Sequence, residues 1–256
     1  MRWDPAQYAR YADERSRPFF DLTARIDAPA PRRVVDLGCG PGTLTATLAE
    51  RWPGAVVEGI DSSADMIEQA QALRADRLTF HLADVATWQS DDVDVIVSNA
   101  TLQWVPGHQD LMRAWAEQLP ADGWLAVQVP GNFDAPSHLL MRELAESPTW
   151  ADRLGGVLHH HDSVATPTEY AQLLLDSGLH ADAWETTYVH RLDGPNPVLE
   201  WVRGTGLRPV LAALSADDGA EFEREYAAAL RDAYPATEHG TLFPFRRIFA
   251  VGHRAT

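Results

Sequence analysis

The sequence predicts an α/β fold built on a doubly wound, mostly parallel sheet, with a helical cap inserted before the last strand. Through the first 130 residues, short apolar runs alternate with segments of helical period. This alternation is typical of parallel strands joined by right-handed helical crossovers. From residue 194 to residue 240 helical patterns continue, and one further apolar run follows them, which indicates the inserted cap.

Seven runs have the length and composition of buried strands: residues 34–37, 56–60, 78–82, 93–98, 123–129, 181–190 and 245–251. Helical patterns occupy residues 43–51, 62–73, 111–119, 138–146 and 168–177, and others fill the cap at 194–240. Two short helices are expected within residues 1–32, separated by a break at Arg17–Pro18, and we expect them to cover the site. All these elements are assigned to one domain, residues 1–256.

Composition and charge limit the compartment and the kind of partner. The chain has one cysteine, Cys39, so no internal disulfide is possible, which fits a reducing cytoplasm. No apolar leader follows Met1 and no run approaches the ~20 apolar residues of a membrane span, so we expect a cytoplasmic protein without membrane contacts, a monomer or a weak homodimer. A net charge of −16 would repel a phosphate backbone, which argues against a nucleic-acid partner.

A glycine-rich loop follows the first predicted strand. The stretch Val34 to Gly42 contains Asp36 and then glycines at positions 38, 40 and 42. Such glycines let the chain turn sharply and let a ligand approach bare backbone. A dinucleotide site is the main alternative, but its G-x-G-x-x-G/A fingerprint requires a smaller residue where Thr43 stands. Asp36 would repel a pyrophosphate and suits an ammonium group, so the loop favours a cationic ligand without phosphates.

Further carboxylates follow the next two strands at the same sheet edge. Asp61 ends the second strand, where a carboxylate can accept hydrogen bonds from both hydroxyls of a ribose. Asp84 and Val85 follow the third strand, where they can accept from an adenine amine and pack against its ring.

Four segments, residues 34–42, 59–63, 83–85 and 98–100, resemble the successive signatures of class I S-adenosylmethionine-dependent methyltransferases. The resemblance implies a Rossmann-like fold and S-adenosylmethionine (SAM) as the cofactor. The positions that it implies for cofactor binding are Asp36, Gly38, Gly40, Gly42, Asp61, Ser62, Met66, Asp84, Val85 and Asn99.

Other segments, residues 11–18, 99–104, 127–130, 140–143 and 205–209, resemble the bacterial members of this family that methylate trans-aconitate. This narrower resemblance implies transfer of a methyl group to a small polycarboxylate, giving a monomethyl ester. A carboxylate with a pKa of about 4 is already ionised at neutral pH, so no general base and no catalytic side chain are expected.

A polycarboxylate inside an acidic protein needs fixed cations, and arginine offers planar, bidentate donors. The residues expected to bind the substrate are Arg15, Arg17, Arg208, Arg246 or its neighbour Arg247, Gln103, Trp104 and Asn132.

Three other functions stay open at this point. They are a methyltransferase for another small acceptor such as a quinone precursor, a nicotinamide-dependent oxidoreductase, and a SAM-binding sensor without turnover. His159, His160 and His161 precede Asp162, but adjacent histidines on a regular element cannot all face one ion. We therefore interpret them as a solvated loop and expect no metal.

Overall fold

The computed structural model describes residues 12–89, 91–158 and 164–256, with side chains from Ser16 onward. Its sheet has the strand order β3-β2-β1-β4-β5-β8-β6, and the short strand β7 pairs with β8. Strands β1 to β5 are parallel to one another, and β8 is antiparallel to both β5 and β6. The predicted doubly wound, mostly parallel sheet of seven strands is confirmed, with two-residue β7 as an addition.

The strands are β1 (Arg33–Leu37), β2 (Val56–Asp61), β3 (Leu78–Leu82), β4 (Val95–Asn99), β5 (Trp124–Pro130), β6 (His180–Leu192), β7 (Ala236–Thr237) and β8 (Gly240–His253). The α-helices are α2 (Ala12–Thr23), α3 (Thr43–Arg51), α4 (Ala64–Ala70), α5 (His108–Gln118), α6 (Pro136–Ala145), α7 (Ala151–Leu154), α8 (Pro167–Asp176), α9 (Pro197–Arg203), α10 (Arg208–Ala213) and α11 (Ala216–Ala233). Short 3-10 helices are η1 (Gln71–Leu73) and η2 (Leu102–Trp104).

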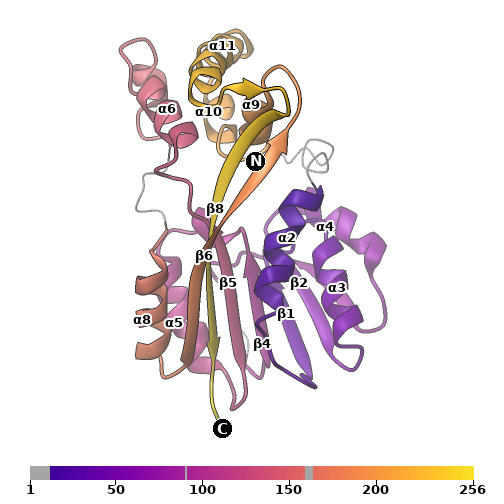
Figure 1. Ribbon diagram of the computed structural model, residues 1–256. Helices are drawn as coiled ribbons and strands as arrows, with labels where there is room; N and C mark the ends of the chain where they lie inside the picture. The colour runs from indigo at the N-terminus through magenta and orange to yellow at the C-terminus, as the bar shows by residue number, and fades with distance from the viewer. Residues whose placement is uncertain (1–11, 90, 159–163) are drawn as a thin grey trace.

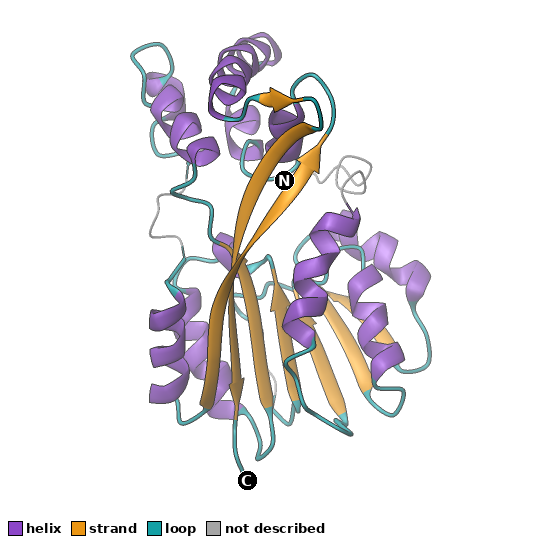
Figure 2. Ribbon diagram, in the orientation of Figure 1, coloured by secondary structure: helices purple, strands orange, loops and turns teal. Residues whose placement is uncertain are grey.

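Helices cover both faces of the sheet. Helices α2, α3 and α4 lie on one face, and α5 and α8 lie on the other (Figure 2). The first face is sealed by side chains such as Phe19, Leu48 and Ile67, and the second by Trp115 and Leu173. These apolar faces bury the sheet and leave its carboxyl edge as the place where polar loops collect.

Helix α2 runs without interruption through Pro18, so the break expected at Arg17–Pro18 is wrong. Proline removes one backbone donor and crowds the preceding turn of a helix. Phe19 and Leu22 are fully buried against the sheet, and the Arg17 guanidinium lies 5.0 Å from the centre of the Tyr188 ring. These packing contacts outweigh the lost hydrogen bond. Residues 1–11, where the first N-terminal helix was expected, lie outside the described residues.

Strands β6 and β8 are longer than the sheet that they complete. The pairing of β8 with β5 ends at Pro130↔Arg247, whereas its pairing with β6 continues to Leu192↔Thr241. On the N-terminal side of Arg247, β8 and its partner β6 therefore leave the sheet as a twisted ribbon (Figure 1). The sequence predicted only the part of β8 from Phe245 to Val251.

The ribbon leads to a set of helices, which we call the helical group: α6, α7, α9, α10 and α11 (Figure 1). Its own hydrophobic cluster includes Trp150, Trp201, Phe222 and the ribbon residue Phe243. Three of these helices belong to the predicted 194–240 segment, and α6 and α7 come from the segment after β5. That this group acts as a cap stays a prediction.

Two tyrosines fix the start of α6 on α11 and on the residue that follows it. The Tyr226 hydroxyl donates to the Ser137 carbonyl oxygen at 2.5 Å, and the Ser137 N–H donates to the Tyr234 hydroxyl at 3.1 Å. Ser137 is fully buried, so water does not replace these partners. No helix among the described residues is both long enough and apolar enough to span a membrane.

We predict that Tyr226→Phe lowers the free energy of unfolding by about 1–3 kcal/mol, because it leaves the buried Ser137 carbonyl without its hydroxyl donor. Urea denaturation of the two proteins measures the difference. Tyr188→Phe is the matched control: its hydroxyl donates to Asp21, whose side chain is 47% exposed and can turn to water instead. Equal losses in both variants would contradict this account of α6.

Candidate functional site

The loop between β1 and α3 turns on three glycines with positive φ. Gly38, Gly40 and Gly42 have φ angles of 87°, 54° and 79°. A Cβ on Gly38 would lie 1.9 Å from the Thr101 hydroxyl, and one on Gly42 would lie 2.6 Å from the Phe80 ring. A Cβ on Gly40 would meet nothing within 4 Å. Gly38 and Gly42 therefore allow close packing, and Gly40 presents bare backbone to open space.

Asp36 is buried beneath this loop. Its Oδ2 accepts a hydrogen bond from the Thr45 hydroxyl at 2.6 Å, which ties the end of β1 to α3. Burial raises the pKa of Asp36 to about 7, the Thr45 hydrogen bond lowers it, and the nearby Asp61 charge raises it. At neutral pH the carboxyl group is thus divided between its protonated and ionised forms. A cation bound nearby would favour the ionised form.

Asp61 joins the end of β2 to the glycine loop. Its Oδ2 accepts from the Gly40 N–H at 2.9 Å, and its Oδ1 accepts from the Ser63 N–H at 2.8 Å. Each oxygen keeps a further lone pair for a ligand. Ser63 is the residue that caps α4, with its hydroxyl accepting from the Met66 N–H, while Ser62 is exposed.

The remaining predicted cofactor residues follow along the same edge. Met66 and Val85 are buried, and Asp84 is exposed with Oδ1 accepting from the Ala86 N–H at 2.9 Å. Asn99 ends β4, and its buried Oδ1 has no hydrogen-bond partner among the described residues. Its strand partner Gln128 is fully buried with both amide atoms equally without partners. Buried polar atoms of this kind are rare, and they mark a place where a ligand or water completes the bonding.

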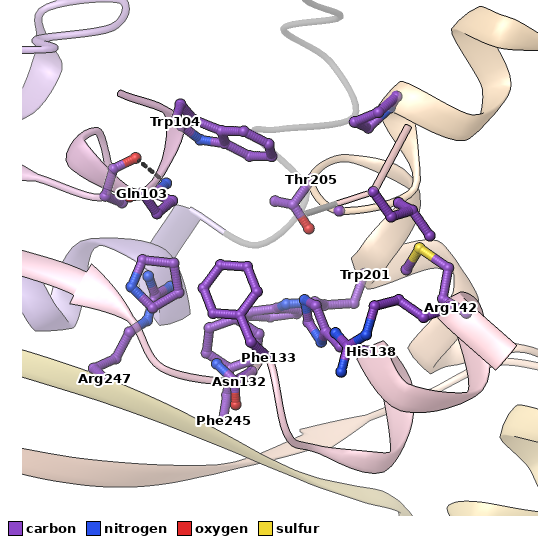
Figure 3. Close-up of a pocket in the computed structure, with 16 residues that line it drawn as sticks. Gln103, Trp104, Asn132, Phe133, His138, Arg142, Trp201, Thr205, Phe245 and Arg247 are labelled. Carbon is purple, nitrogen blue, oxygen red and sulfur yellow. Dashed lines mark hydrogen bonds between the residues drawn. The ribbon is translucent and has the colours of Figure 1, made fainter. Parts of the chain in front are cut away.

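A pocket lies between the carboxyl ends of β4 and β5 and the helical group (Figure 3). Its walls come from the β4–α5 connection, the β5–α6 connection, the helical group (α6 included) and β8. They comprise Ala100, Gln103, Trp104, Pro130, Asn132, Phe133, His138, Met141, Arg142, Leu158, Trp201, Thr205, Gly206, Pro209, Phe245 and Arg247.

The three predicted substrate residues that are not arginines, Gln103, Trp104 and Asn132, all line this pocket. Gln103 donates to the Ala100 carbonyl at 2.6 Å, and its buried Oε1 has no partner within the described part of the chain. Asn132 spends both amide atoms on the backbone of Arg246, at 2.8 Å each, so one N–H remains for a ligand. Trp104 is 38% exposed and stands at the pocket wall.

The arginines divide by position. Arg247 is buried, lines the pocket and stacks over the Phe245 ring at 4.6 Å. Arg246 points to the other side of β8, where Nη1 lies 3.7 Å from Glu185. This division follows from the alternation of side chains along a strand. Arg208 is half-buried beside the lining residue Pro209, and Arg17 is exposed. The side chain of Arg15 lies outside the described residues.

Two functional candidates on α6, His138 and Arg142, were not predicted. They stand one helical turn apart and both line the pocket. Burial lowers the pKa of His138 to about 4, with a smaller effect from the charge of Arg142, so the imidazole is neutral at pH 7. Their spacing of four residues was a readable signal for one helix face, but which face meets the pocket depends on how α6 docks.

The histidine run at 159–161 lies outside the described residues. Among the residues that the structure describes, no group of three or more His, Cys, Asp and Glu side chains could hold a metal ion.

Comparisons with known proteins show which family the chain resembles. The methyltransferase domain family matches residues 8–183. Trans-aconitate 2-methyltransferase of Streptomyces avermitilis is 56% identical over 98% of this chain and 97% of its own, and that of Rhodococcus jostii is 55% identical over 97% and 98%.

Solved structures resemble the fold at low sequence identity. Geranyl diphosphate C-methyltransferase of Streptomyces coelicolor has a TM-score of 0.55 at 15% identity, covering 97% of this chain and 82% of that one. Phosphoethanolamine N-methyltransferase 2 of Haemonchus contortus has a TM-score of 0.54 at 14% identity, covering 94% and 53%. At such identities the likeness concerns the fold.

We predict that Asp36 makes the ligand-free protein less stable as pH rises from 5 to 8. Its pKa of about 7 in the fold lies above the ~3.9 of an unfolded chain, so the native state holds an extra proton between these values and loses stability as pH rises through them. Asp36→Asn should remove this loss, gaining a few kcal/mol relative to the parent at pH 8 and little at pH 5.

Urea denaturation at the two pH values, without ligand, measures the effect. Asp84→Asn, which changes an exposed carboxylate at the same edge, should keep the parent's pH dependence. An Asp36→Asn variant whose pH dependence equals that of the parent would show that this carboxyl group is not responsible.

Proposed function

Because this chain belongs to the methyltransferase domain family, we propose that it transfers a methyl group from SAM to a carboxylate of trans-aconitate, forming a monomethyl ester. Relatives named for that activity are 49–57% identical across almost the whole chain. The observation that carries the proposal is the pocket itself. The pocket lies at the carboxyl end of β4, on the same sheet edge as the expected cofactor residues. Two arginines, Arg247 and Arg142, stand in its walls.

The residues present fit SAM. Gly40 leaves open space above the loop, and the buried Asn99 Oδ1 has no hydrogen-bond donor among the described residues. The carboxylate of Asp61 ends β2, and that of Asp84 follows β3. This set suits a cationic nucleoside: Asp61 would accept from ribose hydroxyls, and Asp84 with Val85 would meet the adenine. Asp36 below the loop favours the positively charged amino-acid end.

When bound, SAM supplies an electrophilic methyl carbon, to which a carboxylate oxygen bonds as the carbon–sulfur bond breaks, and no proton moves. The chain's own task is to bind, orient and desolvate the carboxylate. Trp104, Phe133 and Trp201 line the pocket and would exclude water from a bound acceptor, and Arg247 would supply fixed positive charge. No side chain has to act as a base because the acceptor is ionised at neutral pH.

The compartment, the oligomeric state and the partners belong to the same proposal. We place the reaction in the cytoplasm, consistent with a single cysteine, and expect a monomer or weak homodimer without a nucleic-acid partner. The net charge of −16 supports the last point.

The direct test incubates the protein with trans-aconitate and SAM labelled in its methyl group. We predict a labelled product that mild base hydrolyses to labelled methanol, as expected for a methyl ester. A panel of acceptors, including a phenolic quinone precursor and a no-acceptor control, runs in parallel. Label that appears only in a base-stable phenol ether or carbon-methylated product would contradict the proposal.

Gly40 allows a separate test of the cofactor site. We predict that Gly40→Ala weakens S-adenosylhomocysteine binding at least tenfold in calorimetry, since its methyl group would project into the space above the loop. The positive φ adds a strain of roughly 1 kcal/mol to folding. Gly54→Ala, which also meets nothing within 4 Å but has no positive φ, should bind as the parent does. Unchanged affinity in Gly40→Ala would place the cofactor elsewhere.

A further inference from the structure

Arg142 is a cation for which the described residues provide no anion. No ion pair and no hydrogen bond from its guanidinium occurs among the residues that the structure describes, although it is half-buried in a pocket wall. Other arginines of the helical group are paired: Arg153 on α7 lies 2.7 Å from Asp218, and Arg203 on α9 lies 2.6 Å from Glu223. The chain has 37 acidic and 21 basic residues, yet none of the acids that the structure describes forms an ion pair with Arg142. Its position in the pocket suggests that the missing anion is a ligand.

Arg142 is the charged side chain that α6 contributes to the pocket lining. His138, one turn earlier on α6, is neutral at pH 7 because burial lowers its pKa to about 4. Its Nδ1 lies 3.1 Å from the Ser137 hydroxyl and its ring packs 5.7 Å from that of Phe133. Ser137 accepts a hydrogen bond from Tyr226 and donates one to Tyr234, and these bonds hold this end of the helix in place. Arg142 is therefore presented from a fixed helix with an uncharged hydrogen-bonding ring beside it.

The second cation of the pocket stands on the other side. Figure 3 shows Arg247 and Arg142 on opposite sides, with Phe133, Trp201 and Phe245 between them. Arg247 comes from the sheet, and Arg142 comes from the helical group. Two cations separated by aromatic walls match a small molecule that carries a carboxylate at each end and an apolar skeleton between them.

We propose that Arg142 is a specificity-determining residue: it binds one of the two carboxylates of the acceptor that do not receive the methyl group, while Arg247 binds the other. This inference rests on the proposed function, since a tricarboxylate acceptor has two unreacted carboxylates to place. Arg142 selects tricarboxylates over dicarboxylates, because an acceptor that lacks the matching carboxylate forms no ion pair with the Arg142 guanidinium. Docking of α6 is thereby linked to recognition, since the same helix carries the arginine.

The test compares Arg142→Gln with the parent on trans-aconitate and on three dicarboxylates, itaconate, glutaconate and mesaconate, each of which lacks one of its carboxylates. We expect Arg142→Gln to raise the KM for trans-aconitate at least tenfold, with S-adenosylhomocysteine affinity unchanged within twofold. For the dicarboxylate that lacks the carboxylate bound by Arg142, the kcat/KM values of variant and parent should agree within twofold. Arg142→Lys, which keeps the charge but not the bidentate geometry, should fall between them.

Arg224→Gln is the matched control. It removes the same charge from α11, where the side chain is 71% exposed and outside the pocket, and it should behave as the parent does. The inference is overturned if Arg142→Gln leaves the KM for trans-aconitate unchanged, or if it weakens all four acceptors by one common factor.

Calorimetry with trans-aconitate in the presence of S-adenosylhomocysteine separates this inference from the proposed function. A parent protein that binds trans-aconitate through Arg142 but forms no ester would support the inference and contradict the proposed function. Ester formation with equal trans-aconitate affinity in Arg142→Gln and parent would support the function and overturn the inference.

Discussion

The double hydrogen bond between the Asn132 side chain and the Arg246 backbone fixes where the sheet ends and the pocket begins. Strand β5 stops at Pro130, and the Gly131 N–H still donates to the Arg246 carbonyl at 2.9 Å. The Asn132 amide then extends the ladder by one more step, with both contacts at 2.8 Å. Past this point the chain turns away toward α6, while β8 continues with β6 alone. The divergence of these two paths opens the space that the pocket occupies.

The same junction sorts the two arginines of β8. Gly131 has no side chain, and a Cβ there would come within 2.8 Å of the Arg246 Nε, so Arg246 can lie across it toward Glu185. Arg247 is consequently left on the opposite face, against Phe245 and in the pocket. A one-residue shift in the β5–β8 register would exchange the two side chains. The positive charge of the pocket therefore depends on strand register as much as on sequence.

Much of this arrangement was predictable because it depends on local pattern. The strands at 34–37 and 56–60 are short apolar runs, and the glycine loop with Asp36 and Asp61 carries its chemistry in consecutive residues. The methyltransferase family inferred from these signatures is confirmed by the match over residues 8–183. Sequence also singled out Gln103, Trp104 and Asn132, which follow strand ends and do line the pocket.

What remained hidden depends on contacts between distant segments. The sequence predicted β6 almost to its end, at residue 190, but missed residues 240–244 of β8, where Gly240 and Pro244 flank the short apolar pair Leu242–Phe243. Asn132 was expected to meet a ligand, but its bonds to Arg246 can be seen only when β8 is in place. Arg142 looks like an ordinary helix-surface arginine until α6 docks on α11. The assignment of substrate residues, Arg15, Arg17 and Arg208 among them, stays a prediction.

The proposed binding of a trianion by a protein with a net charge of −16 poses an electrostatic problem. At physiological ionic strength the screening length is about 8 Å, so acids on the far surface contribute little inside the pocket. Charges in the pocket wall are partly desolvated and screened less, and they dominate the local field. Asp36 and Asp61 lie at the sheet edge where the cationic cofactor is proposed to bind, and Arg247 and Arg142 line the pocket proposed for the acceptor. In the proposed arrangement opposite charges divide the site between donor and acceptor, so the acidic surface is compatible with an anionic substrate.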